Sequence, residues 1–195
     1  MFRLGLTGSI GMGKSATADL FRQHGCDVWD ADAAVHRLYA SGGRAVAPIA
    51  AEFPDAVEDG AVSRDRLRQI VADNPDALTR IERIVHPLLA QDRADFVTNT
   101  RADIVVFDIP LLFETGGNSG MDAVVCVDVS EDEQRARVLS RGTMSEAHFE
   151  AIKAKQMPNA EKCARADYVV ETDTPEHAAR QVRAIVDDIR RARDA

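Results

Sequence analysis

The sequence predicts an α/β protein in which helices flank a parallel β-sheet. Three observations lead to this prediction. Strand-like apolar runs alternate with helix-like segments, which is the pattern of parallel strands joined by helical crossovers. A glycine-rich segment joins the first strand to the first helix. One later run, residues 104–109 (IVVFDI), is apolar at almost every position, as expected of a strand that is buried on both faces.

The strands and helices follow one another in a regular order. The chain opens with a strand at residues 2–7 and a helix at residues 14–24, which Gly25 ends. Further strands are expected at residues 26–29, 104–109, 123–129 and 168–170. Further helices are expected at residues 131–141 and 175–193.

A long stretch without a strand pattern, residues 34–100, separates the early strands from the later ones. It is helical in pattern and is punctuated by glycine and proline. Because the sheet resumes after it, we expect a helical insertion rather than a separate domain. A second charged helical stretch, residues 141–165, interrupts the sheet again. The expected organisation is one domain with its core in residues 1–33, 101–140 and 166–195.

Composition and charge limit the classes of protein. A chain of 195 residues that is 45% hydrophobic and 29% charged is long enough for one domain with a sizeable core. No apolar run is long enough to span a membrane, and no signal peptide is visible. The widely spaced Cys26, Cys126 and Cys163 favour reduced thiols in the cytoplasm over disulfides or a zinc site. The net charge of −8 argues against a general nucleic-acid binder.

The glycine-rich segment at residues 8–15 (GSIGMGKS) fits the pattern G-x-x-x-x-G-K-[ST] at every required position. Glycines let such a loop wrap with its N–H groups pointing inward, and the helix that follows adds positive potential at the same point. We therefore expect a phosphate-binding loop (P-loop). The residues expected to hold ATP are Gly11, Met12, Gly13, Lys14, Ser15 and Ala16. Lys14 would contact the β- and γ-phosphates, and the Ser15 hydroxyl would bind Mg²⁺.

The rest of the chain favours a small-molecule kinase over a switch protein. The GTPase patterns D-x-x-G and N-K-x-D do not occur in the sequence. A kinase needs a place for the phosphate acceptor and a cover that excludes water. Residues 34–100 would supply the substrate-binding insertion, and residues 141–165 would form the lid.

The whole chain resembles the dephospho-CoA kinase family. The matching segments are LTGSIGMGKS at residues 6–15, DAD at 30–32, HPL at 86–88 and DIPLLFE at 108–114. The resemblance implies a P-loop fold, ATP and dephospho-CoA as substrates, Mg²⁺ as cofactor, and transfer of the γ-phosphate to the ribose 3′-hydroxyl. We expect a cytoplasmic monomer or weak oligomer without nucleic-acid or membrane partners. The alternatives are another small-metabolite kinase, for a nucleoside monophosphate or a sugar acid, and a nucleotide-dependent regulatory switch.

Acidic and basic residues near the expected P-loop receive catalytic roles. Asp32 is the family's candidate base and would accept the proton of the acceptor hydroxyl, whereas Asp30 is expected to cap the next helix. Asp108 ends a hydrophobic strand, the position of the acidic residue that supports Mg²⁺ in P-loop proteins, directly or through water. Arg141 would stabilise charge on the phosphates during transfer.

The acceptor side is expected to include His86, Pro110 and Leu111. Pro87 biases His86 away from helical conformation. The apolar loop at residues 110–113 is expected to pack against the substrate, with Glu114 as a solvated loop acid. In the lid, Gln156 is expected to shape the segment. The basic lid residues are weaker candidates for phosphate contacts and are more typical of a wet surface: Lys153, Lys155, Lys162 and Arg165.

Overall fold

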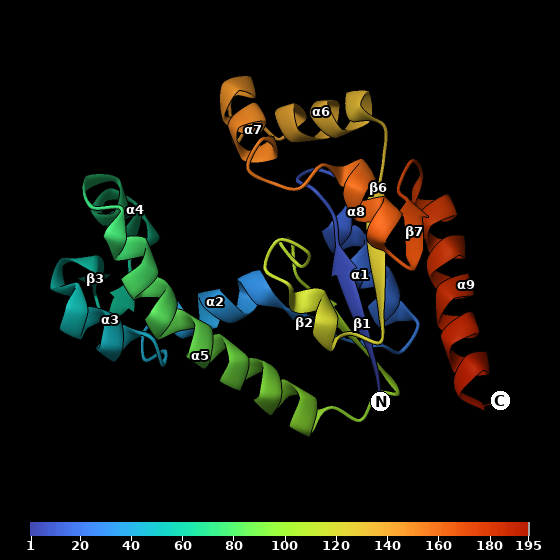
Figure 1. Cartoon of the computed structure of the whole chain (residues 1–195), viewed down its shortest axis with the longest axis horizontal. Coiled ribbons are helices and arrows are strands. Elements are labelled where there is room, and N and C mark those ends of the chain that lie inside the picture. Colours follow the sequence, from blue (N-terminus) through green and yellow to red (C-terminus); the bar gives the residue numbers. More distant parts are fainter. Residues whose placement is uncertain (195) are drawn as a thin grey trace. The chain divides into compact units, whose positions relative to one another are not determined.

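The computed structural model describes residues 1–194 (Figure 1). The chain folds into two compact units. The first comprises Met1–Trp29 and the chain from Arg101 onward, and the second is Asp30–Thr100. The second unit lies where the helical insertion is expected, and its role in binding a substrate stays a prediction. Within residues 1–194, none of the helices combines the length and the hydropathy that a membrane-spanning helix needs.

The sheet of the first unit has five strands in the order β2-β5-β1-β6-β7. Their bounds are β1 Phe2–Thr7, β2 Asp27–Asp30, β5 Ile104–Asp108, β6 Ala123–Asp128 and β7 Tyr168–Glu171. The pairs β1–β5, β1–β6 and β6–β7 are all parallel, which confirms the predicted fold class. Leu6 of β1 is in register with Asp108 of β5, so these strands end together at the edge where α/β proteins bind ligands.

Among the residues that the structure describes, five helices complete the first unit. They are α1 Lys14–Gln23, α6 Glu131–Ser140, α7 Glu146–Lys153, α8 Asn159–Arg165 and α9 Pro175–Asp194, with a short 3₁₀ turn, η2, at Gly117–Gly120. Figure 1 shows α6 and α7 beyond the carboxyl end of β6, whereas α8 returns beside that strand. Apolar side chains of strands and helices form one core, and the most deeply buried include Leu4, Leu6, Phe21, Val125 and Val182.

The second unit is mainly helical and has its own core. Its elements are α2 Ala31–Tyr39, α3 Val46–Glu52, the 3₁₀ helix η1 Pro54–Ala56, the strands β3 Val57–Glu58 and β4 Ala61–Val62, α4 Arg64–Asp73 and α5 Asp76–Asn99. Buried side chains from these elements pack together, among them Leu38, Ile49, Phe53, Leu67 and Ile81.

The hairpin of β3 and β4 corrects the expectation that residues 34–100 contain no strand. Val57 pairs with Val62, and Glu58 pairs with Ala61. The two residues between the strands, Asp59 and Gly60, have φ angles of 49° and 76°. Positive φ at both central residues is what a type I′ hairpin turn requires, and Asp-Gly is its sequence signal.

His86 and Pro87 lie inside α5, so the expectation that Pro87 keeps its neighbour out of a helix is wrong. A proline within a helix removes one N–H donor and crowds a preceding carbonyl, at a cost of about 3 kcal/mol. Ile81, Val85 and Leu88 of the same helix pack into the core of the second unit. Each such side chain contributes about 1.5–3 kcal/mol when fully buried, so packing outweighs the local preference.

Candidate active site

The P-loop connects β1 to α1 and has a backbone that only glycine allows at two points. Gly11 and Gly13 have φ angles of 79° and 92°. A Cβ atom on Gly11 would lie 2.5 Å from Val138 Cγ2, and one on Gly13 would lie 2.9 Å from Thr172 Oγ1. Within residues 1–194, no hydrogen-bond acceptor engages the N–H groups of these two glycines. The loop therefore presents free donors next to the N-terminus of α1, as an anion site requires.

Lys14 forms an ion pair with Asp108 beside this loop. The side chain of Asp108 is 2% exposed, and that of Lys14 is 17% exposed. Asp108 ends β5, which pairs with β1, and Lys14 begins α1, the helix that follows β1 and the P-loop. Ser15 is exposed in the first turn of α1. Its hydroxyl and the Asp108 carboxylate are oxygen ligands, the type that Mg²⁺ prefers, so the residues present fit this ion.

A pocket of about 340 Å³ adjoins the P-loop. Its lining combines apolar side chains with two arginines: Gly13, Ala16, Thr17, Leu20, Arg137, Arg141, Thr172, Thr174, Pro175 and Ala178. Arg137 donates to Thr172 Oγ1 at 2.9 Å and to Thr172 O at 2.5 Å, and Thr172 Oγ1 donates to Met12 O at 2.8 Å. These bonds hold the segment after β7 against the P-loop. Arg141, the cap residue after α6, is exposed.

A buried lysine, Lys162, bonds to the loop that follows β5. The ammonium group of Lys162 donates to Pro110 O at 2.9 Å and lies 2.8 Å from Glu114 Oε1. Thr7 Oγ1 also donates to Pro110 O, at 3.0 Å. The Lys162 side chain is 0% exposed, so the expectation of a wet lid surface is wrong for this residue. Glu114 is likewise an ion-pair partner rather than a solvated acid.

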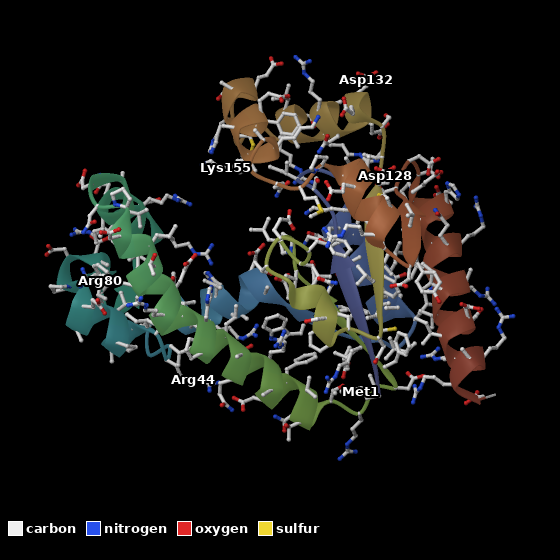
Figure 2. The ribbon with its side chains drawn as sticks, in the orientation of Figure 1. Met1, Arg44, Arg80, Asp128, Asp132 and Lys155 are labelled. Carbon is white, nitrogen blue, oxygen red and sulfur yellow. The ribbon has the colours of Figure 1, made fainter. Side chains whose placement is uncertain are left out.

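Two other basic residues near the lid, Lys153 and Arg165, also have partners. Lys153 Nζ lies 3.2 Å from Glu131 Oε1. The Arg165 guanidinium lies 4.9 Å from the centre of the Phe113 ring. Figure 2 shows Lys155 beside α7, and this side chain is exposed.

The apolar loop after β5 is more buried than expected. Leu112 and Phe113 pack into a small cluster of the first unit, where they are 0% and 6% exposed. Leu111 is exposed at 41% and Pro110 is half-buried. Within the segment 110–113, Leu111 therefore presents the largest free apolar surface.

Two predicted acceptor-side residues, Asp32 and His86, belong to the second unit. Asp32 is exposed in the first turn of α2, and His86 is exposed on α5. Asp30 Oδ1 accepts the N–H of Ala33 at 2.9 Å, which is the expected N-cap bond of α2. The carboxylate of Asp30 is thereby engaged in holding the helix end, whereas the carboxylate of Asp32 makes no hydrogen bond or ion pair within residues 1–194.

Two of the three cysteines lie together although they are far apart in the sequence. The Sγ atoms of Cys126 and Cys163 are 3.4 Å apart, and Cys26, Cys126 and Cys163 are all free thiols. Burial raises the pKa of Cys126 and of Cys163 above the usual range. Such thiols are poor nucleophiles.

Several site residues carry no local sequence signal. Gln134 contacts the P-loop from α6, Asn159 contacts it from α8, and Thr172 contacts it from the end of β7. Each is a single polar residue within an ordinary helix or strand end. Only the position of Thr172 just after the last strand, at the ligand-binding edge of the sheet, could have drawn attention to it.

The sequence comparisons with known proteins agree on one family. A family model described as "Dephospho-CoA kinase" matches residues 2–177. A dephospho-CoA kinase of Ruegeria pomeroyi is 67% identical over 97% of this chain and 96% of its own length, and one of Cereibacter sphaeroides is 58% identical over 100% and 98%. Among solved structures, TT1252 of Thermus thermophilus is 30% identical with a TM-score of 0.85 over 96% of this chain and 97% of its own. A dephospho-CoA kinase of Campylobacter jejuni, 20% identical, shares the fold with a TM-score of 0.68 over 98% of both chains.

Proposed function

The chain belongs to the dephospho-CoA kinase family, and from that premise we propose which of its residues bind the substrates and which carry the transfer. It is an ATP-dependent phosphotransferase, and the reaction moves the γ-phosphate of ATP to the ribose 3′-hydroxyl of dephospho-CoA, giving CoA and ADP. The observation that carries the assignment of residues is the P-loop. The Lys14–Asp108 ion pair lies beside this loop, and the pocket that Arg141 helps to line adjoins it.

The adenine ring of ATP binds in the pocket next to Gly13. Leu20, Pro175 and Ala178 supply apolar surface there, and a pocket of about 340 Å³ is of the size that small ligands use. Arg141 lines the same pocket, and a guanidinium plane stacks well on an aromatic ring. Arg137 is already bonded to Thr172, so Arg141 is the arginine that is available for the nucleotide. Arg141 is expected to stabilise charge on the phosphates. Its place in this pocket suggests that it also stacks on the adenine ring.

The phosphates bind at the P-loop, from Gly11 to Ala16. The N–H groups of the loop and the Lys14 ammonium group neutralise charge that grows on the transferred phosphate. Asp108 holds the ammonium group at the mouth of the loop. Mg²⁺ would be bound by the Ser15 hydroxyl, with Asp108 contributing directly or through water. When bound, this ion stabilises negative charge on the phosphate oxygens.

Dephospho-CoA is contacted by Asp32, His86, Pro110 and Leu111. Asp32 is exposed at the start of a helix, so its carboxylate is free to accept the proton of the ribose hydroxyl. Leu111 offers exposed apolar surface, and Pro110 is fixed by the bonds from Thr7 and Lys162 to its carbonyl. The loop is therefore rigid at the point where the acceptor would be positioned.

The test measures ADP release and the phosphorylated product with dephospho-CoA, with AMP, with a sugar acid and with no acceptor. We expect rapid ADP release only with dephospho-CoA, and a product with the mass of CoA. Arg141→Ala should weaken ATP binding about tenfold or more, whereas Arg135→Ala, which removes a nearby arginine paired with Glu146, should leave it unchanged. Equal effects of both substitutions, or ADP release that ignores the acceptor, would contradict the proposal.

A further inference from the structure

One side chain before the segment at residues 141–165 and one side chain within it bond to the backbone of the same P-loop residue, Ile10. The N–H group of Ile10 donates to Gln156 Oε1 at 3.0 Å. The carbonyl of the same residue accepts from Gln134 Nε2 at 2.7 Å. Gln134 lies on α6, before this segment, and Gln156 follows α7 within it. We propose that Gln134 and Gln156 are positioning residues that fix the two peptide units on either side of the Ile10 Cα atom, so that the later N–H groups of the loop stay aimed at the phosphates.

Asn159 holds the residue before Ile10 in the same way. Its Oδ1 atom accepts the N–H of Ser9 at 3.0 Å. Its Nδ2 atom donates to Val127 O at 3.1 Å and to Asp128 Oδ1 at 2.8 Å. Figure 2 labels Asp128, where β6 ends next to α8. Because both Nδ2 bonds have oxygen acceptors, only one orientation of the amide satisfies the group, and Oδ1 faces the P-loop.

Gln134 is an unusual side chain for a buried position. It is 0% exposed, and its Oε1 atom has no hydrogen-bond partner within residues 1–194. A buried polar atom without a partner lowers the free energy of unfolding, and an apolar side chain of the same size would avoid that loss. A residue that lowers stability while bonding the nucleotide loop is expected at a functional position rather than at a packing position.

These contacts divide the P-loop into two parts. The N–H groups of Ser9 and Ile10 are bonded to side chains, whereas those of Gly11 and Gly13 have no acceptor within residues 1–194. A loop whose backbone is already ordered loses less conformational entropy when phosphate binds. Loss of the Gln156 contact should therefore weaken ATP and ADP by the same factor, while the chemical step on bound ATP keeps its rate. The inference rests on the proposed nucleotide site.

The first test uses Gln156→Ala and measures ATP and ADP binding by calorimetry, turnover at saturating ATP, and hydrogen exchange of the Ile10 amide. We expect both dissociation constants to rise about three- to tenfold, the factor that corresponds to one net hydrogen bond. Turnover should stay within about twofold, and the Ile10 amide should exchange faster. The matched control is Gln91→Ala, because Gln91 Nε2 donates to Asp95 Oδ1 at 2.8 Å within the second unit. This control should leave both nucleotide affinities unchanged.

The second test separates positioning from stability. Gln134→Met keeps the volume of the side chain, and removal of the unpartnered Oε1 atom offsets the loss of the hydrogen bond to Ile10 O, so the unfolding free energy should stay close to that of the parent. ATP should nevertheless bind about three- to tenfold more weakly, because the Ile10 carbonyl loses its donor. Unchanged ATP affinity in either variant, or an equal loss in Gln91→Ala, would overturn the inference. A parent protein that binds no ATP would refute the proposed function itself, which is a different result.

Discussion

Replacing Lys162 by methionine tests the buried ion pair that joins α8 to the loop after β5. The ammonium group is fully buried, contacts Glu114 at 2.8 Å and donates to Pro110 O at 2.9 Å. Methionine retains most of the volume of the lysine stem but donates no hydrogen bond. The variant therefore leaves the Glu114 carboxylate without its cation in a site where the carboxylate side chain is only 19% exposed.

The expected loss of unfolding free energy follows from these contacts. Removing one partner of a buried ion pair costs about 3–5 kcal/mol. Glu114 keeps the bond from the Met157 N–H, at 2.9 Å, and retains some contact with water. We therefore expect a loss of about 2–3 kcal/mol, at or below the lower end of that range. Lys162→Ala also removes three buried methylene groups and should cost about 2 kcal/mol more.

The assay is urea unfolding at pH 7, followed by the fluorescence of Trp29. This is the single tryptophan of the chain, it is 3% exposed, and it lies in the unit that contains the ion pair. The double variant Lys162→Met with Glu114→Gln should recover about 1 kcal/mol, because the unpaired charge is gone. Lys155→Met, at an exposed position, should change stability by less than about 0.5 kcal/mol. A loss below about 0.5 kcal/mol in Lys162→Met, or no recovery in the double variant, would refute the reasoning.

The same pair predicts a dependence on pH. Burial alone would raise the pKa of Glu114, but the hydrogen bonds from Lys162 and from the Met157 N–H outweigh it and hold the pKa below its usual range. A carboxyl group with a lowered pKa in the folded state stabilises the fold above its unfolded pKa, and that contribution is lost as the pH falls through the folded value. The stability difference between the parent and Lys162→Met should therefore be full at pH 7 and shrink below about pH 4.

Three further predictions concern the reaction. Lys14→Met should lower turnover at saturating ATP about 100-fold or more, because the lysine acts on charge in the transition state; near-normal turnover would contradict this role. Asp32→Asn should lose at least about 100-fold in turnover with little change in melting temperature. Asp30→Ala, which removes the helix cap, should lose about 1 kcal/mol of stability and keep its turnover. The reverse pattern would mean that Asp30 is the base. Limited proteolysis within residues 141–165 should be suppressed by ATP and dephospho-CoA together, and cleavage that ignores both would show that the segment does not act as a lid.

Much of the fold could be predicted from the sequence because its signals are local. The run at residues 104–109 indicates a buried strand from its own composition, and Gly25 marks the end of the first helix within one residue. The failures have equally definite causes. The hairpin at Asp59 and Gly60 is too short to give an alternating pattern, and α5 continues through Pro87 because distant side chains stabilise it. Tertiary packing overrides local preference at this proline.

The residues of the candidate site likewise fall into those that the sequence could predict and those that it could not. The P-loop could be predicted because its residues are consecutive, so one motif contains the whole of the phosphate cradle. Gln134, Asn159 and Thr172 could not, because they reach the loop from α6, α8 and the end of β7. Lys162 lies in a charged helical stretch whose composition suggests a solvated surface, and only the position of α8 beside β6 buries it.

The strand order has a consequence for how the chain is made. β1 is bonded to β5 and β6, and β2 lies next to β5, so neither early strand has a partner in the sheet until β5 has been synthesised. Between the end of β2 at Asp30 and the start of β5 at Ile104 lie 73 residues, 31–103. At about 5–20 residues per second, a ribosome needs about 4–15 seconds to make them. During that interval the apolar strand β1 is unpaired and open to aggregation, while the helical unit, which has its own core, can already fold. We therefore expect the helical unit to form first on the ribosome and the catalytic sheet to close only after it.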